Sequence, residues 1–539
     1  MASQGVEIEK KYDVGEDAVV PSLADLPGVD RVGEPHVTSL EAVYFDTGDY
    51  VLASRRITLR RRTGGTDAGW HLKLPPGNSA GAASDPGDAS AAGDASEPQQ
   101  RRELHEPLGQ PAVVPERLLA HLHAYLRGAE LAPVVRLETQ RSTYPLYAET
   151  GMHLADLADD RVEAEVLGSG PGPDGGDPKQ EWREWELELV QGDEDLFPAA
   201  AELLAEAGAS PSRYPSKLAR ALGAGPETGE TGAPGGQAPG TQELGKKSPA
   251  SAVVTAYLGE QIGELLAYDP GVRLEEPDAV HQMRSAARRA RSVLASYRRL
   301  FSAVAVRRLR DELKWLGGVL GVPRDAEVLM DRLRGHVEEL PPDQASPLVL
   351  ESVERDLGAR IDSGYRKVQK VLLSERYFRL LDDLEAFRDQ PPVRPKGGAP
   401  ARKVGAKAVE KAARRLRRSH KAAKNSRKGA RHEMALHQVR KDAKRLRHVG
   451  ESVGPVYGKR AARIAKAARK QQQILGDFHD SVLARDLVGR LGSAPGLPEP
   501  VASAYVTLRT RQVQLVADAE SKYLKARKKS RKILSRRVI

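Results

Sequence analysis

The sequence predicts a multidomain α+β molecule: an antiparallel β barrel or sandwich, followed by an all-α part made of two similar halves. Three observations predict this fold class. Short strand-like runs separated by Gly, Pro and Asp fill residues 5–165 and 183–190. From about residue 249 onward, Ala, Leu, Arg and Val recur at helical spacings of three and four. Within that helical region, two similar motifs follow each other 156 positions apart.

Length and composition limit the classes of protein to consider. A chain of 539 residues is too long for one core, so two or three domains are expected. It has no cysteine, which excludes disulfides and thiolate metal sites and leaves oxygen and nitrogen ligands. The sequence shows neither a signal peptide nor an apolar run long enough for a membrane span. The cytoplasm is therefore the expected location, and no membrane partner is expected.

Positive charge is concentrated near the C-terminus. Residues 401–539 hold 37 of the 84 Lys and Arg residues but only 10 of the 74 Asp and Glu residues. The rest of the chain is therefore net acidic. A basic segment on an acidic chain predicts a polyanionic partner, for which nucleic acid and polyphosphate both fit.

Composition shifts divide the chain into a first domain at 1–223, a linker at 224–248 and a helical domain at 249–539. A stretch rich in Gly, Ala, Ser, Asp and Pro at about 77–100 is interpreted as a loop insertion in the first domain. The linker is rich in Gly and Pro and has no apolar period. A second polar linker at about 389–407 separates a first repeat, about 249–388, from a second, about 408–539.

The first strand, VEIEKKY at 6–12, carries charged residues on one face. Side chains alternate along a strand, so Glu7, Glu9 and Lys11 point to one side and Ile8 to the other. Such charges are costly to bury unless they meet opposite charges. The carboxylates could hold a divalent cation and the lysine an anionic oxygen, which suits a metal–phosphate substrate.

The same alternation recurs on the other strands. The charged and polar faces hold Thr58, Arg60 and Arg62; His71 and Lys73; Arg101, Glu103 and His105; Thr139 and Arg141; and Glu184, Glu186 and Glu188. In a closed sheet these faces would converge inside. They could instead be the solvent face of a half-buried sheet. The prevalence of Glu, Arg and Lys over Ser, Thr, Asn and Gln favours the charged interior.

Several of these motifs together resemble the CYTH family, the triphosphate tunnel metalloenzymes. They are Glu7-x-Glu9-x-Lys11, Tyr44-Phe45-Asp46-Thr47, Leu59-Arg60-Arg61-Arg62, Lys73, Glu184-Trp185-Glu186-Leu187-Glu188 and Ser216-Lys217. The family includes thiamine triphosphatases, inorganic triphosphatases and class IV adenylate cyclases. The resemblance covers residues 1–223 and implies an eight-stranded tunnel barrel with flanking helices, a divalent metal and a triphosphate substrate.

The resemblance also implies roles for individual residues. Glu7, Glu9 and Lys11 would be catalytic, with Mg²⁺ or Mn²⁺ as the cofactor. The implied metal ligands are Glu7, Glu9, Asp156, Glu184, Glu186 and Glu188. The implied triphosphate ligands are Lys11, Arg60, Arg62, Lys73, Arg101, Arg141 and Lys217. Asp156 stands where relatives usually carry Glu, so its ligand atom would be displaced by about one methylene.

In the helical region, His281, Arg284, Arg288 and Arg291 have the spacing that keeps one stripe of a helix. His437, Arg440, Lys444 and Arg447 repeat it. Cations gathered on one stripe repel each other unless an anion or acids neutralise them. These motifs resemble the CHAD family, the conserved-histidine α-helical domain, over about 249–539. The resemblance implies two pseudo-repeated helical bundles flanking a basic channel that binds polyphosphate.

The two stripes would line that channel, with Lys314, Lys466 and Lys470 as further polyphosphate ligands. The basic run at 522–537 has little aromatic content, so at most nonspecific contact with nucleic acid is expected. The predicted function is metal-dependent hydrolysis of inorganic triphosphate or short polyphosphate, with a helical domain that binds polyphosphate.

Four alternatives remain open at this point. The protein could be a noncatalytic polyphosphate-binding protein associated with polyphosphate granules, a thiamine triphosphatase, a class IV adenylate cyclase, or a nucleic-acid-binding protein. The sequence leaves the oligomeric state open.

Overall fold

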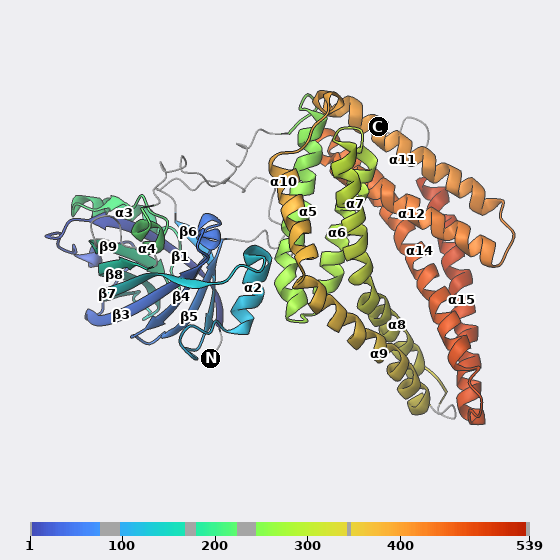
Figure 1. Cartoon of the computed structure of the whole chain (residues 1–539), viewed down its shortest axis with the longest axis horizontal. Helices are drawn as coiled ribbons and strands as arrows, with labels where there is room; N and C mark the ends of the chain where they lie inside the picture. The colour runs from blue at the N-terminus through green and yellow to red at the C-terminus, as the bar shows by residue number, and fades with distance from the viewer. Residues whose placement is uncertain (1–2, 76–97, 168–178, 224–243, 342–345, 535–539) are drawn as a thin grey trace. The chain divides into compact units, whose positions relative to one another are not determined.

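The structure is a computed structural model that describes residues 3–75, 98–167, 179–223, 244–341 and 346–534 (Figure 1). The chain divides into two compact units, Met1–Thr241 and Gln242–Ile539. Most of the predicted insertion at 77–100, most of the linker at 224–248 and the last residues of the basic run lie outside the described residues.

Antiparallel strands form the first unit. In the described part of this unit they are β1 (Ser3–Val14), β2 (Arg31–Val32), β3 (His36–Asp46), β4 (Thr58–Thr63), β5 (Gly69–Leu74), β6 (Gln99–Glu106), β7 (Ala132–Tyr147), β8 (His153–Val166), β9 (Gln180–Leu189) and β10 (Ser210–Pro211).

The sheet closes on itself. Its strand order is β1-β6-β5-β4-β3-β7-β8-β9, and β9 pairs back onto β1, with Lys11 opposite Glu186. The two short strands are outside this ring, with β2 paired to β7 and β10 to β1. The predicted eight-stranded antiparallel barrel is therefore confirmed. Of the two architectures that strand alternation allowed, the barrel is correct.

Helices cover the outward apolar faces of the barrel. α1 (Val51–Ser54) and α2 (Glu116–Leu126) pack on β4, β5 and β6, where Trp70 and Leu72 are fully buried. α3 (Leu196–Glu206) packs on the face that carries Trp185. Asp46, at the end of β3, accepts hydrogen bonds from the backbone N–H groups of Thr47, Leu52 and Ala53 and so caps the short α1. With their apolar sides covered in this way, the strands turn their charged sides inward.

One end of the barrel interior is apolar. Short α4 (Lys217–Ala221) packs Leu218 against the inward-facing residues Val162 and Trp182. Ser216 caps this helix by accepting a hydrogen bond from the N–H of Ala219. This packing directs Lys217, the first residue of α4, toward the charged part of the interior.

The second unit is helical. Its helices, over the described residues, are α5 (Ala250–Arg273), α6 (Ala279–Tyr297), α7 (Ala303–Val319), α8 (Gly321–Glu338), α9 (Ser346–Leu372), α10 (Glu375–Asp389), α11 (Ala401–Lys424), α12 (Ala430–Ser452), α13 (Gly454–Tyr457), α14 (Lys459–Leu491) and α15 (Glu499–Ser530).

The two helices that carry the repeated motifs, α6 and α12, contact each other. α8, α9, α14 and α15 share a separate apolar core that includes Leu333, Leu357 and Leu508. The all-α second part is therefore confirmed. Between α10 and α11 the described chain forms only a short 3-10 helix, Pro395–Gly398. Among the described residues, no helix has both the length and the apolar character that crossing a bilayer requires.

Candidate active site and anion-binding stripes

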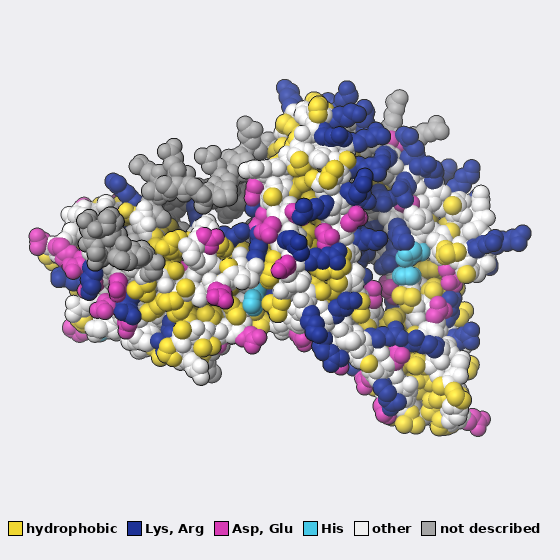
Figure 2. Space-filling model, in the orientation of Figure 1, with side chains coloured by type: hydrophobic (Ala, Val, Ile, Leu, Met, Phe, Trp, Pro, Cys, Tyr) yellow, Lys and Arg dark blue, Asp and Glu magenta, His cyan; other side chains and the backbone are white. Residues whose placement is uncertain are grey.

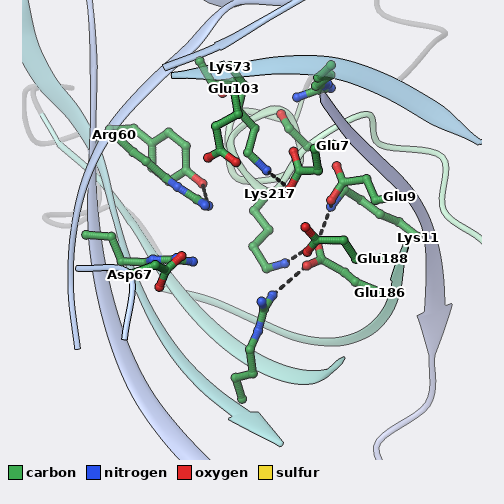
Figure 3. A pocket seen from close by; sticks show the side chains of 16 residues that line it. Glu7, Glu9, Lys11, Arg60, Asp67, Lys73, Glu103, Glu186, Glu188 and Lys217 are labelled. Carbon is green, nitrogen blue, oxygen red and sulfur yellow. Dashed lines mark hydrogen bonds and ion pairs between the residues drawn. The ribbon is translucent and has the colours of Figure 1, made fainter. Parts of the chain in front are cut away.

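The barrel encloses a charged cavity of about 90 Å³ (Figure 3). Its lining residues are Glu7, Glu9, Lys11, Tyr44, Thr58, Arg60, Arg62, Asp67, Lys73, Arg101, Glu103, Arg141, Glu186, Glu188, Ser216 and Lys217. Seven of these side chains are basic and six are acidic. Strand alternation thus brings charges of both signs into one enclosed space.

Ion pairs join the two walls of the cavity. Lys73 Nζ lies 2.6 Å from Glu7 Oε1, and Lys11 Nζ lies 3.0 Å from Glu9 Oε2. Lys11 also forms a close ion pair with Glu186. Burial alone would favour the neutral form of Glu9, but Lys11 and Lys73 outweigh it and lower the pKa of Glu9 to about 2. Glu9 is therefore ionised.

A second cluster lies around Lys217. Its Nζ is 2.9 Å from Asp160, 2.7 Å from Glu184 and 2.6 Å from Glu186. Arg141 binds Asp160 through two nitrogens, at 2.7 and 2.6 Å, and contacts Glu186 at 2.6 Å. The three acids overcome the effect of burial and raise the pKa of Lys217 well above its usual value. Asp160 is completely buried and was not predicted from the sequence.

Two groups of carboxylates have the chemistry of a metal site. Oxygen ligands of Asp160, Glu184 and Glu186 lie within 4.8 Å of one another, so this cluster could hold a cation, although Lys217 already contacts all three. On the β1 side, Glu7 Oε2 is buried without a hydrogen-bond partner. Burial and the nearby carboxylates Glu7 and Glu9 raise the pKa of Glu188 to about 7. An excess of buried carboxylate oxygens fits a hard divalent ion.

The opposite wall presents arginines. Arg60 donates a hydrogen bond to the hydroxyl of Tyr44 at 3.3 Å. Arg62 forms a close ion pair with Asp67, which lies between β4 and β5. Burial and the neighbouring cations Arg60 and Arg141 lower the pKa of Arg62 to about 9. A phosphoryl group on this wall would relieve that repulsion.

Two of the predicted metal ligands do not line the cavity. Asp156 shares the inward register of β8 but pairs with His153 at 2.8 Å and is about one-third exposed. Glu184 is buried beyond the cavity, where its carboxylate also accepts a hydrogen bond from the Trp182 indole at 2.6 Å. The other predicted barrel residues all line it. Thr58 and Glu103, which were predicted on inward faces without a role, also line it, as do Tyr44 and Ser216 of the family motifs. The prediction missed Asp67 in the lining and Asp160 behind it.

In the helical unit the two cationic stripes come close together. Arg288 on α6 lies near Arg284 and Arg440, and together with burial they lower its pKa to about 10. Lys444 on α12 is more crowded: burial, Arg288 and Arg440 hold its pKa well below the usual value. Lys and Arg side chains gather over much of the visible face of this unit (Figure 2). At Arg288 and Lys444 the strongest charged neighbours are other cations, unlike at Lys217 in the barrel.

The histidines that begin the stripes have different surroundings. Burial and Arg324 lower the pKa of His281. His437 stacks against His479 of α14, with ring centroids 4.5 Å apart. Burial and that neighbour lower the pKa of His437 to about 4. Both histidines are therefore neutral near pH 7 and could gain protons when an anion binds.

Some of the cations in the two stripes form ion pairs with acidic residues. Arg284 binds Asp325 of α8 through both terminal nitrogens, at 2.7 and 3.1 Å, and Arg447 pairs with Glu451 at 2.6 Å. Arg291 lies near Arg310, which was not predicted. The remaining predicted residues are exposed on α7 and α14: Lys314, Lys466 and Lys470.

Comparison with known proteins agrees with both halves of this arrangement. The CYTH domain model matches residues 6–222, and the CHAD domain model matches residues 256–489. Two proteins of Mycobacterium tuberculosis are each 38% identical over 492 residues, covering 89% of this chain and 88% of theirs: Uncharacterized protein MT2285 (strain CDC 1551 / Oshkosh) and Uncharacterized protein Rv2226 (strain ATCC 25618 / H37Rv).

Solved structures cover parts of the chain. PptA from Streptomyces chartreusis has a TM-score of 0.45 at 19% identity and covers 52% of this chain and 100% of its own. The CHAD domain of the plant Ricinus communis has a TM-score of 0.43 at 25% identity and covers 52% of this chain and 93% of its own.

The CYTH match places the barrel in the tunnel-enzyme family, whose members include triphosphatases and cyclases and depend on a metal. The order of the two matched segments is the order of the barrel and the helical unit along the chain. The protein is therefore a member of the family in which a CYTH domain is followed by a CHAD domain.

Proposed function

We propose that this protein is a divalent-metal-dependent hydrolase of inorganic triphosphate or short polyphosphate, and that its helical unit binds polyphosphate. One observation carries the catalytic part: a single enclosed cavity lined by carboxylates on β1 and β9 and by guanidinium and ammonium groups on the facing strands. Acids alone would suit a cation, and bases alone an anion. Both together suit an anion that arrives with a metal.

The metal would be held by Glu7, Glu9, Glu186 and Glu188, with Mg²⁺ or Mn²⁺ favoured by the all-oxygen donor set. When bound, it would neutralise phosphoryl oxygens and activate water. Arg60, Arg62 and Lys73 would bind the phosphate chain and stabilise the charge that spreads over the transferred group. Lys11, fixed between Glu9 and Glu186, would position an oxygen at the reacting phosphorus.

An inorganic substrate is favoured within this enzyme class. Tyr44 is the one aromatic residue of the described lining, and its hydroxyl binds Arg60, so no stacking platform for adenine or thiamine stands out. Phosphate release from tripolyphosphate, thiamine triphosphate and ATP, measured with Mg²⁺ and Mn²⁺ while cyclic AMP is monitored, would rank the substrates. Faster turnover of ATP or thiamine triphosphate would overturn the inorganic assignment.

Glu9→Ala and Lys11→Ala should each lower metal-dependent turnover about 10²-fold or more, by analogy with lost transition-state donors. Lys179→Met, which removes an exposed cation, is the matched control and should retain turnover. Full activity of Glu9→Ala or Lys11→Ala would refute the catalytic assignment.

The stripes of α6 and α12 support the binding part of the proposal. Their crowded cations gain most from a flexible polyanion that follows them, whereas base-stacking aromatics are sparse in the basic region. Competition of long polyphosphate with DNA for the full-length protein separates these partners. Stronger binding of DNA would overturn the polyphosphate assignment. If polyphosphate wins, the protein is expected to colocalise with polyphosphate granules in the cytoplasm.

A further inference from the structure

Asp67 differs from every other carboxylate that lines the described cavity. The others are on strands β1, β6 and β9, whereas Asp67 is in the turn between β4 and β5. Its side chain is 55% exposed, against 8% for Glu7 and 10% for Glu186. Asp67 is therefore an acid at the border between the cavity and solvent.

The backbone of this turn is held in place. Gly64 and Gly65 both have positive φ angles, and a Cβ on Gly64 would lie 2.1 Å from the carbonyl oxygen of Ser39. A ring nitrogen of His71 lies 2.9 Å from the Asp67 carbonyl oxygen. The turn is thus anchored on both sides, and rotation of the Asp67 side chain alone would take its carboxylate into or out of the cavity.

The partner of Asp67 is a predicted phosphate ligand. Its carboxylate forms a close ion pair with a terminal nitrogen of Arg62, whose side chain is 8% exposed. A guanidinium binds carboxylate and phosphoryl oxygens with the same planar geometry. An incoming phosphoryl group and Asp67 therefore need the same face of Arg62.

The other cations that grip the cavity are paired differently. Lys73 and Arg141 contact acids fixed on strands and nearly buried, such as Glu7 and Asp160. Those acids are enclosed, so rotating away would leave a buried carboxylate without its partner. Asp67 can leave, because its side chain reaches solvent where water replaces the ion pair at little cost.

We propose that Asp67 is an internal competitor that occupies Arg62 until a phosphoryl group displaces it. This side chain would weaken binding of all anions at Arg62 and penalise singly charged ones most, because a multiply charged phosphate displaces it more easily. Asp67 would thus help to set specificity for short, highly charged phosphate chains. The inference rests on the proposed function for the identity of the substrate class.

The test compares Asp67→Asn, Asp67→Glu and wild-type protein in tripolyphosphate hydrolysis. Asp67→Asn keeps the side-chain shape and removes the competing charge, so KM should fall about two- to fivefold, the range of an exposed ion pair, while kcat changes less. Asp67→Glu should return KM toward the wild-type value. Asp25→Asn, an exposed acid of the 3-10 helix Leu23–Asp25, is the control for net charge and should leave KM unchanged.

Binding without turnover provides a second measurement. Calorimetric titration of the full-length protein with tripolyphosphate in the presence of a chelator should show tighter binding to Asp67→Asn by the same factor. The gain should be larger for singly charged sulfamate than for tripolyphosphate, because wild-type Asp67 penalises singly charged anions most. The tripolyphosphate result decides whether Asp67 competes at Arg62.

An unchanged KM in Asp67→Asn would mean that Asp67 has no effect on substrate binding, and a raised KM would mean that Asp67 positions Arg62 for the substrate. Either result would overturn the inference. That outcome would leave the proposed hydrolase intact. If Asp67→Asn binds tripolyphosphate more tightly but neither it nor the wild-type protein hydrolyses any substrate, the competitor role of Asp67 stands and the proposed hydrolase is wrong. If neither protein binds tripolyphosphate and neither hydrolyses it with Mg²⁺ or Mn²⁺, both the competitor and the hydrolase are overturned.

Discussion

The barrel cavity and the helical stripes both gather cations, but they treat charge in opposite ways. In the cavity, Lys73, Arg141 and Lys217 each contact carboxylates: Lys217 contacts three, and its pKa is raised. On the stripes, Arg288 and Lys444 meet mainly other cations, and their pKa values are lowered. One region is neutralised from within, and the other is left to an external anion.

The difference indicates which ligand each region needs. A cavity that balances its own charge gains little from an anion alone, because the anion must displace an acid or bring a cation with it. A surface of unbalanced cations gains from any flexible polyanion, and that gain decreases as salt screens the charges. Under the proposed function, the same residue types would bind a metal-bound substrate in one region and a bare polyanion in the other.

The largest effect is expected from removing a cation of the barrel. Lys217→Met would leave Asp160, Glu184 and Glu186 without their shared partner, so the free energy of unfolding of the barrel should fall by about 3–5 kcal/mol. Denaturant unfolding followed by tryptophan fluorescence measures this, because Trp70, Trp182 and Trp185 lie in the barrel and only Trp315 lies outside it.

Lys179→Met is the matched control, since Lys179 pairs with Glu163 at an exposed position and should matter much less. Equal losses in the two variants would mean that the buried acids do not depend on Lys217. The contrast between a neutralised cavity and unbalanced stripes would then fail.

A histidine of the helical unit gives the next effect. Burial, opposed only in part by the contact with Gln471, lowers the pKa of His420 to about 4 from 6.5. As pH falls, His420 is protonated in the unfolded chain near pH 6.5 but in the folded chain only near pH 4. The free energy of unfolding is therefore highest above pH 6.5 and decreases as pH falls from 6.5 to 4. The loss should be on the order of 2–3 kcal/mol.

The check is the pH dependence of helix unfolding, followed by circular dichroism at 222 nm. His420→Gln should flatten the curve between pH 6.5 and 4 relative to wild type. A curve that remains as steep would show that His420 does not stay neutral in the folded chain, and would assign the acid sensitivity to other groups.

The smallest expected effect is a gain in stability, whereas Lys217→Met should lose stability. Arg288→Gln removes one of several mutually repelling cations, so the helical unit should become more stable by about 1 kcal/mol while its affinity for polyphosphate falls about tenfold. Thermal unfolding at low and high salt measures the first part, and titration with polyphosphate the second. Destabilisation at low salt would contradict the idea that the stripes are electrostatically strained.

Much of the fold could be predicted because charged and apolar residues alternate regularly along the strands and recur at helical spacing in the second unit. Alternation placed Arg60, Lys73 and Glu186 on inward faces, and the spacing of three and four placed each cationic stripe on one helix face. The pairing of β9 with β1 could not be read from any single strand, because closure depends on how eight strands twist together. The strand pattern left a barrel and a sandwich open, and the family resemblance then implied the closed eight-stranded barrel.

The site was predicted less completely for a physical reason. Alternation gives the face of a residue but not its depth, which depends on the stagger between strands. Asp156, Asp160 and Glu184 all point inward, yet one pairs with His153 near the end of its strand and the other two are buried behind Lys217. Asp67 follows no alternation because it is in a turn. Arg310 could not be predicted because it lies near Arg291 only through the packing of α7 beside α6.

Lys217 also sets the shortest segment that contains the complete barrel site. It is the first residue of α4, the last helix described before residue 224, and its ammonium group is the common counter-ion of three buried carboxylates. A barrel excised a few residues earlier would keep every strand and still lack this charge. The domain can therefore be transplanted, fused or permuted only as a piece that includes α4, so its modular boundary is electrostatic as well as structural.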